Sequence, residues 1–249
     1  MGDKGLKKDI QTILSANTVS EVWEPLLAYL QQIGFHHVLY GFTRFHTPNG
    51  FGDDKDHLFL TNFDQDYMKG YFLEGRYRHA PMIRWSIDNV GACSWGWITE
   101  NMDSFTKQER DVVAFNKKMG VTCGYTIAFP HALKRAKAAI GLSLEPHKGT
   151  QEEADEIWAQ HGEELEIICS VAHLKLVSLP LPKRMLTKRQ REVLEWIGDG
   201  KTVADTAQIL GLNKATVEKH LRLAREALGV ETTAQAVLKA SMHNQIFTF

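Results

Sequence analysis

Apolar positions recur most regularly near the C-terminus, between residues 202 and 228. Four of them have helical spacing and share one face, which we expect to be buried. They are Val217, Leu221, Ala224 and Leu228. Asn213 is a good N-cap residue, so the pattern predicts a helix from Lys214 to Leu228.

Three residues before and within this helix have the spacing of a helix-turn-helix. Ala207 is small enough to let two helices approach closely, and Gly211 tolerates the positive φ that a tight turn needs. Val217 then packs the second helix onto the first. Because such a unit places its second helix in the major groove, the stretch predicts DNA binding.

The opposite face of the predicted helix carries Ala215, Lys219 and Arg222. A small side chain lets the backbone come close to the bases, and two cations can reach guanine edges or phosphates. The alternative is an ordinary surface helix with solvated charges. Turn spacing, cap and basic face all agree with the first interpretation.

The periodicity of the remaining chain predicts helices and strands in mixed order. Capping boxes, in which Glu or Gln follows Thr after three residues, begin at Thr18, Thr106, Thr150 and Thr187. We predict helices at about 18–34, 64–74, 81–87, 106–119, 150–177, 188–198, 203–210, 214–228 and 233–243. We predict strands at about 37–45, 58–61, 122–129 and 138–145, with 91–98 as a further strand or a pocket wall.

Two prolines in the segment 178–185 stop the long helix and favour extended chain, which predicts a linker between two domains. Residues 1–177 then form an α+β domain, an α-β-α sandwich with a mostly antiparallel sheet of four or five strands. Residues 186–249 form an all-α, four-helix unit that contains the helix-turn-helix.

Charge is divided unevenly between these predicted domains. The chain of 249 residues has a net charge of −1, and its 43% of apolar residues is enough for a packed core. From residue 183 onward, eleven Lys and Arg stand against seven Asp and Glu, which gives +4 and leaves −5 on the rest. A basic domain on an acidic body fits DNA binding joined to another task. Since +4 is modest, we expect tight binding to need two copies.

Other features favour a cytoplasmic protein without a cofactor. Cys93, Cys123 and Cys169 are widely spaced and form no CxxC motif, so we expect free thiols. We see no signal peptide and no apolar run of about 20 residues, and we expect no membrane association. The histidines, including His36 and His37, lack metal-ligand spacing, so we expect no metal.

The C-terminal residues resemble the DNA-binding domain of the LuxR/FixJ family. The matching positions are Leu186, Thr187, Arg189, Glu192, Val193, Leu194, Gly200, Lys201, Thr202, Ala207, Ile209, Leu210, Thr216, Val217 and His220. The resemblance implies that Lys201 and Thr202 lie near phosphate and that Lys219 and Arg222 face bases. Gln190 replaces the family's usual Glu but keeps the capping box. The DNA-binding set is completed by Ala215, Thr216 and His220.

Two kinds of domain commonly precede this one. A phosphoacceptor receiver needs five βα repeats and an acidic cluster, whereas Asp53 and Asp54 lie in a loop without such partners, typical of a solvated turn. The other kind is the autoinducer-binding domain of quorum-sensing LuxR proteins, which residues 15–175 resemble. This resemblance rests on the spacing of Tyr71, Pro81, Trp95 and Gly124.

In that family the pocket holds an acyl-homoserine lactone by polar contacts, and several of these contacts are missing here. Ala80 stands where the family has an Asp that accepts the ligand's amide N–H. Tyr67 replaces a Trp and can still donate, whereas Phe63 replaces a Tyr and cannot. Thr126 remains polar, while Gly141 has no side chain. The ligand-binding set implied by the resemblance is Phe63, Tyr67, Tyr71, Ala80, Trp95, Gly124 and Thr126.

These departures leave the nature of the ligand open. Burying an unpaired amide group costs about 1–3 kcal/mol, or roughly 10- to 100-fold in affinity. An ordinary acyl-homoserine lactone therefore fits poorly unless His79 or Arg78 replaces the missing Asp. A less polar or aromatic ligand, or activity without any ligand, are the alternatives. Aromatic residues at helical spacing are also typical of plain core, and the resemblance favours pocket lining for Tyr67, Tyr71 and Trp95.

Together these features predict a LuxR-type transcriptional regulator that binds dyad-symmetric, double-stranded DNA as a homodimer. We expect the apolar positions of the long helix at 150–177 to form intramolecular core, a dimer seam or both, and the last helix to offer a second seam. The seam residues expected on the last helix are Ala234, Val237, Leu238 and Met242. The alternative is an enzyme or metabolite-binding protein whose C-terminal helices are only structural. No nucleophile–base pair, metal cluster or phosphate loop supports an enzyme.

Overall fold

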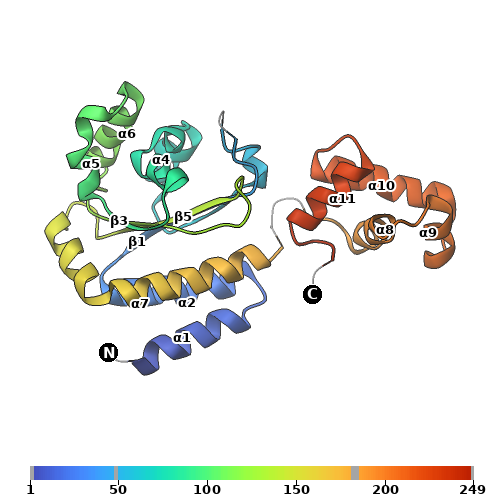
Figure 1. Cartoon of the computed structure of the whole chain (residues 1–249), viewed down its shortest axis with the longest axis horizontal. Helices are drawn as coiled ribbons and strands as arrows, with labels where there is room; N and C mark the ends of the chain where they lie inside the picture. The colour runs from blue at the N-terminus through green and yellow to red at the C-terminus, as the bar shows by residue number, and fades with distance from the viewer. Residues whose placement is uncertain (1–2, 48–49, 181–184, 248–249) are drawn as a thin grey trace. The chain divides into compact units, whose positions relative to one another are not determined.

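The computed structural model describes residues 3–47, 50–180 and 185–247. The chain divides into two compact units, Met1–Leu176 and Val177–Phe249. Each unit has its own fold (Figure 1). Of the linker predicted at 178–185, residues 181–184 lie outside the described residues.

The first unit is built on a five-stranded sheet in which every neighbouring pair is antiparallel. The strand order is β2-β1-β5-β4-β3. The strands are β1 (His37–Thr43), β2 (Leu58–Thr61), β3 (Gly91–Ser94), β4 (Gly124–Ala128) and β5 (Lys137–Ser143). The predicted α+β class with a mostly antiparallel sheet of four or five strands is confirmed.

Helices cover both faces of this sheet (Figure 1). One face is covered by α2 (Val19–Ile33) and α7 (Gln151–Ser178), and α1 (Asp3–Ser15) packs against α2. The other face is covered by α4 (Pro81–Asp88), α5 (Gly96–Glu100) and α6 (Lys107–Lys118). Short turns complete the unit, namely α3 (Gln65–Met68), η1 (Asp54–Asp56), η2 (Lys69–Leu73), η3 (Arg76–His79) and η4 (Met102–Ser104).

Helix starts were predicted more accurately than helix interiors. Thr106 and Glu109 form the expected reciprocal capping box at the start of α6. The single helix predicted at 64–74 is instead α3 followed by the π-helical turn η2. Gly70 lies in that turn against the Phe115 ring, where an added Cβ would approach to 2.5 Å. The helix is present where it was predicted, but its change to a π-helical turn was not foreseen from the sequence.

Alternation along the strands gives the sheet two different faces. Val38 and Tyr40 on β1 are fully buried, as are Ile140 and Leu142 on β5. The residues between them alternate to the opposite face. There Leu39 lies beside Gly141, Gly41 beside Ala139, and Thr43 beside Lys137. Small side chains on this second face leave room for a cavity.

Gly124, at the start of β4, is required by the backbone. Its φ is +153°, and an added Cβ would lie 2.0 Å from the carbonyl oxygen of Leu142 on the neighbouring strand. The side chain of Gln151 on α7 holds this residue from the other side. Its Oε1 accepts from the Gly124 N–H at 3.0 Å, and its Nε2 donates to the Gly124 carbonyl at 3.2 Å.

Among its described residues, the second unit contains four helices, as predicted. They are α8 (Lys188–Gly198), α9 (Val203–Leu210), α10 (Lys214–Leu228) and α11 (Thr233–Met242). All four apolar residues predicted for the inner face of α10 are buried in the core of this unit. Gly211 has a left-handed φ of +63° and ends α9, as the turn requires. None of the helices in the described parts of the chain could cross a membrane.

A buried histidine lies between α7 and the sheet. The Nδ1 atom of His173 is 2.9 Å from the Tyr40 hydroxyl, and its ring stacks on Phe129 with the centroids 4.3 Å apart. Burial, with the nearby His131, lowers the pKa of His173 to about 3. The neutral ring therefore accepts the Tyr40 proton and belongs to the apolar core.

This histidine should make the first unit sensitive to acid. Between pH 6.5 and about 3, the unfolded chain binds a proton at His173 that the folded chain does not. Its contribution to the free energy of unfolding is complete above pH 6.5 and decreases as the pH falls. In urea titrations from pH 7.5 to 5, His173→Phe should therefore show a shallower loss of stability than the parent. The exposed-residue control His36→Gln should keep the parent slope, and equal slopes for all three proteins would contradict the prediction.

Candidate DNA-contacting face and ligand cavity

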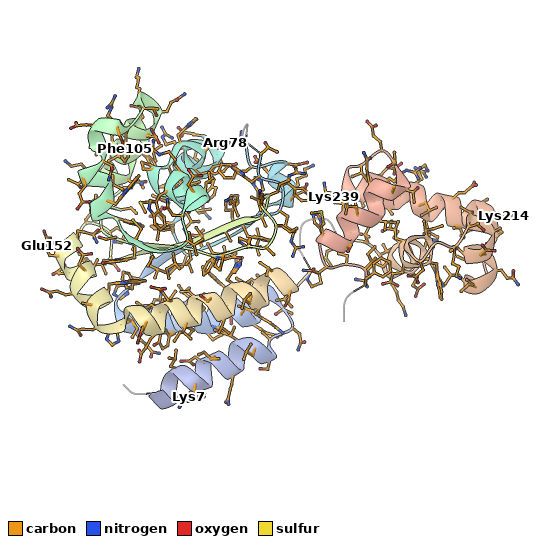
Figure 2. The ribbon with its side chains drawn as sticks, in the orientation of Figure 1. Lys7, Arg78, Phe105, Glu152, Lys214 and Lys239 are labelled. Carbon is orange, nitrogen blue, oxygen red and sulfur yellow. The ribbon has the colours of Figure 1, made fainter. Side chains whose placement is uncertain are left out.

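The outer face of α10 is exposed, and most of the residues expected to contact DNA lie on it. Ala215, Lys219 and Arg222 are exposed, while Thr216 and His220 are half-buried. Thr216 contributes to the start of the helix, because its backbone N–H and its hydroxyl both donate to Asn213 Oδ1, at 2.8 and 2.9 Å. Lys214 projects from the first turn (Figure 2).

The two cations of this face differ in their partners. Arg222 donates to Glu226 Oε1 at 2.6 Å, and both side chains are more than half exposed. Lys219 forms no ion pair with any residue that the structure describes. Since an exposed ion pair contributes only about 0–1 kcal/mol to stability, Glu226 competes only weakly with DNA for the Arg222 guanidinium.

Lys201 and Thr202 precede α9 and are both exposed. Thr202 is the N-cap of this helix, and its hydroxyl donates to Asp205 Oδ2 at 2.7 Å. This hydrogen bond, together with one from the Thr202 N–H, lowers the pKa of Asp205. Lys201 thus precedes a helix start at which the Thr202 N–H already has a carboxylate partner.

A cavity of about 360 Å³ lies in the first unit, between the sheet and the helices that include α4. Its wall includes Leu39 and Gly41 from β1 and Pro81 and Met82 from α4. Six of the seven residues expected to bind a ligand line it, namely Phe63, Tyr67, Tyr71, Ala80, Trp95 and Thr126. Gly124 is not among the lining residues, and its glycine is explained by the close contact with Leu142.

Stacked aromatic rings form one wall of the cavity. The Phe63 and Tyr67 rings have centroids 4.3 Å apart, and those of Tyr67 and Tyr71 are 5.2 Å apart. The Tyr67 hydroxyl donates to Asn116 Oδ1 at 3.1 Å. The Tyr71 hydroxyl has no hydrogen-bond partner among the described residues, and burial raises its pKa. It is therefore a neutral donor available to a ligand.

Trp95 and Thr126 form a polar pair in the same cavity. The indole N–H of Trp95 donates to Thr126 Oγ1 at 2.8 Å. Thr126 lies opposite Gly141 in the ladder between β4 and β5. A Cβ on Gly141 would be 3.6 Å from the Trp95 ring, an ordinary van der Waals contact, so Gly141 lies directly beside the indole.

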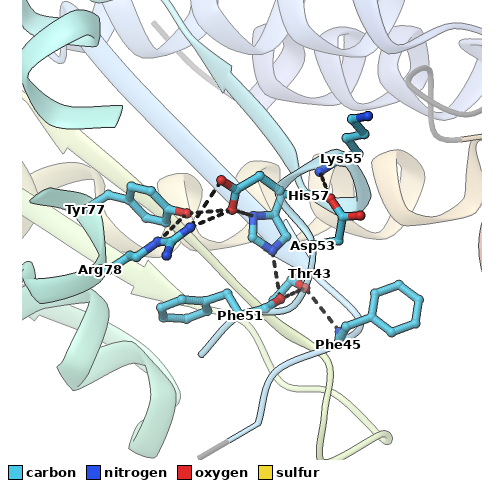
Figure 3. Close-up of polar contacts among 9 residues, drawn as sticks. Thr43, Phe45, Phe51, Asp53, Lys55, His57, Tyr77 and Arg78 are labelled. Carbon is cyan, nitrogen blue, oxygen red and sulfur yellow. Dashed lines mark hydrogen bonds and ion pairs between the residues drawn. The ribbon is translucent and has the colours of Figure 1, made fainter. Parts of the chain in front are cut away.

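Asp54, Tyr77 and Arg78 form a polar network, here called the rim network, in which Tyr77 also lines the cavity (Figure 3). Asp54 Oδ1 accepts from the Tyr77 hydroxyl and from Arg78 Nη2, each at 3.0 Å. On the same loop, the Phe51 carbonyl is 2.7 Å from His57 Nε2 and accepts from Thr43 Oγ1 at 2.9 Å. The loop before β2 is thereby tied to η3 and to β1.

The rim network changes two interpretations of the sequence. Asp54 is not a merely solvated turn residue, since it holds Tyr77 and Arg78. Arg78 and His79 are both exposed and neither lines the cavity, so neither stands in for the Asp that Ala80 replaces. The pairing of Asp54 with Arg78 spans 24 residues, and no local pattern in the sequence could have indicated it.

Comparison with known proteins assigns both units. Residues 18–176 match the model of the autoinducer binding domain, and residues 184–240 match that of bacterial regulatory proteins of the luxR family. The transcriptional activator AnoR of Acinetobacter nosocomialis is 23% identical over 239 residues, covering 94% of this chain and 95% of AnoR. LuxR of Aliivibrio fischeri, also a transcriptional activator, is 25% identical over 191 residues, 75% of this chain and 74% of LuxR.

Solved structures with the same fold belong to the same group of regulators. Escherichia coli SdiA matches with a TM-score of 0.57 and 17% identity, covering 97% of this chain and 98% of SdiA. CepR2, a LuxR-family factor of Burkholderia cenocepacia, matches with a TM-score of 0.53 and 13% identity, covering 70% of this chain and 93% of CepR2. With its autoinducer-binding domain and its helix-turn-helix, the chain belongs to the LuxR family of transcriptional regulators.

Proposed function

We propose that the protein binds a dyad-symmetric DNA site as a homodimer and that a small molecule in the cavity controls this binding. The observation that carries the DNA part is the exposed α10 face with Lys219 and Arg222 on a fully packed helix-turn-helix. The net charge of +4 from residue 183 onward supports two copies, because few phosphates are neutralised by one. The curated relatives named above are transcriptional activators, which favours activation.

Exposed apolar residues support the homodimer. Within α7, the apolar residues Leu165, Ile168 and Leu176 are buried and therefore belong to the core of their own unit. Ile167 and Leu174 of α7 remain 49% and 65% exposed, seven residues apart on one face. In the second unit, Leu238 of α11 is 62% exposed. We assign Ile167, Leu174 and Leu238 to the dimer interface.

The proposed division of labour follows the two units. Residues 1–177 hold the ligand and contribute to dimerisation, residues 178–185 form the linker, and residues 186–249 bind DNA. Within residues 186–249 we assign base contacts to Lys219 and Arg222. The remaining DNA contacts come from Lys201, Thr202, Ala215, Thr216 and His220. All of these side chains are exposed or half-buried.

The cavity favours a ligand without an amide N–H to satisfy. Ala80 lines it where the family's Asp would accept such a donor, and none of the described lining residues is Asp or Glu. Mass spectrometry of small molecules released from the denatured, purified protein tests this proposal. Recovery of an unmodified acyl-homoserine lactone would contradict the ligand class, and full DNA binding by protein with no released molecule would contradict ligand control.

Ala80→Asp should restore the missing acceptor. It should raise the affinity for N-decanoyl-homoserine lactone by roughly 10- to 100-fold, the value of one buried amide hydrogen bond of about 1–3 kcal/mol. The substitution should not harm folding, because Ala80 is the N-cap of α4 and gives it no side-chain hydrogen bond, whereas Asp is a favoured N-cap residue. Thermal-shift titrations measure the effect. The exposed-site control Ala132→Asp should bind like the parent, and no gain for any acyl chain length would rule the acceptor role out.

Arg222→Ala should weaken binding to the preferred DNA sequence by about 1–3 kcal/mol and relax specificity at one base pair. Glu226→Gln releases Arg222 from its ion pair and should increase affinity by no more than about fivefold. Gel-shift titrations with a duplex selected from a random pool measure both changes. The matched control is Glu192→Gln, which frees Arg189 on α8 and should change nothing. Equal binding by Arg222→Ala and parent would exclude a base contact.

A further inference from the structure

The charged side chains that line the cavity are cations. Among the described lining residues, the side chains that carry charge at neutral pH are Lys117 and Lys137, and none is a carboxylate. The hydroxyl groups of the lining, such as that of Tyr71, can donate or accept, so they do not offset this charge. A ligand with an anionic group therefore matches the charge of this lining better than a cationic one.

Lys137 is placed on the cavity side of the sheet by the strand register. It is the first residue of β5 and pairs with Thr43 of β1, on the same face as Ala139 and Gly141. Its side chain is half-buried, and Nζ donates to the carbonyl of Ile87 near the end of α4. It forms no ion pair with any described residue. The ammonium retains two N–H donors without a counter-charge.

The cation and the Trp95–Thr126 pair lie at different ends of the cavity. Thr126 is opposite Gly141, and Lys137 is four residues from Gly141 along β5, which corresponds to about 13 Å at the usual rise of a strand. Many of the lining side chains are apolar, and Met82 and Ile83 of α4 are among them. Of the two lining lysines Lys117 is exposed, so Lys137 is the half-buried cation of a largely apolar cavity.

A cation in such a space is best satisfied by an anion, since charge-assisted hydrogen bonds are the strong ones and strengthen away from water. A carboxylate is ionised at neutral pH and carries only acceptors. We propose that the ligand is a lipophilic carboxylate whose anionic group pairs with Lys137 and whose apolar body extends toward Trp95. This proposal rests on the proposed function only in taking the cavity as the ligand site.

Three probes that differ only in the head group test the pairing on the full-length protein. Decanoate, decanol and decylamine are titrated at pH 7.5 by thermal shift and by calorimetry. Decanoate should bind roughly tenfold more tightly than decanol, as expected for one charge-assisted hydrogen bond partly open to water. Decylamine should bind more weakly than either.

Variants separate the pairing from general effects of charge. Lys137→Met should bind decanol like the parent and lose the preference for decanoate, whereas Lys137→Arg should keep it. Lys134→Met removes an exposed cation of the neighbouring loop, outside the lining, and should also keep it. Circular dichroism shows whether each variant is folded. If Lys137→Met does not fold, the test uses Lys137→Arg alone, which should keep the preference for decanoate.

Three results would overturn the pairing with Lys137. They are equal binding of decanoate and decanol by the parent, an undiminished preference for decanoate in Lys137→Met, and absence of binding by all three probes. The proposed function is judged separately, by the molecule released from the purified protein and by the DNA titrations.

Discussion

The first unit depends on the alternation of side chains along β1 and β5. Residues on one face, such as Tyr40 and Leu142, are packed against α2 and α7 without space. On the other face, Gly41 and Gly141 present no side chains, and Ala139 presents only a methyl group. Because a shift of one residue would exchange the faces, the register that builds the core also creates the cavity.

A cavity of about 360 Å³ in a small domain has an energetic consequence. Lining atoms that lack neighbours forfeit dispersion contacts, and cavities cost on the order of 24 cal/mol per Å³, so an unfilled space of this size costs several kcal/mol. A ligand that binds only the folded unit stabilises it by RT ln(1 + [L]/Kd), which rises with ligand concentration. The folded fraction of the first unit can therefore follow ligand concentration without any other moving part.

The elements that could be predicted from the sequence are those whose cause is local. A capping box satisfies helix N–H groups within three residues, so the starts of α6 and α8 were readable directly. The inner face of α10 was readable because helical spacing alone selects its four buried residues. The π-helical turn η2 could not be predicted in this way, since Gly70 in that turn packs against the ring of Phe115 on α6. Local patterns in the sequence predicted the structure only where the interacting residues are close in sequence.

The same distinction applies to the site. The resemblance located six of the residues that line the cavity, but it could not show that Gly124 is required by its close contact with Leu142 or that Arg78 is held by Asp54. Nor could it show that Lys137 faces the cavity, because that follows from its pairing with Thr43 across the sheet. Ala80 leaves the cavity without the acidic acceptor expected from the family, and Lys137 places a half-buried cation in its lining. Both features have the same electrostatic sense, and a ligand with an anionic end matches them together.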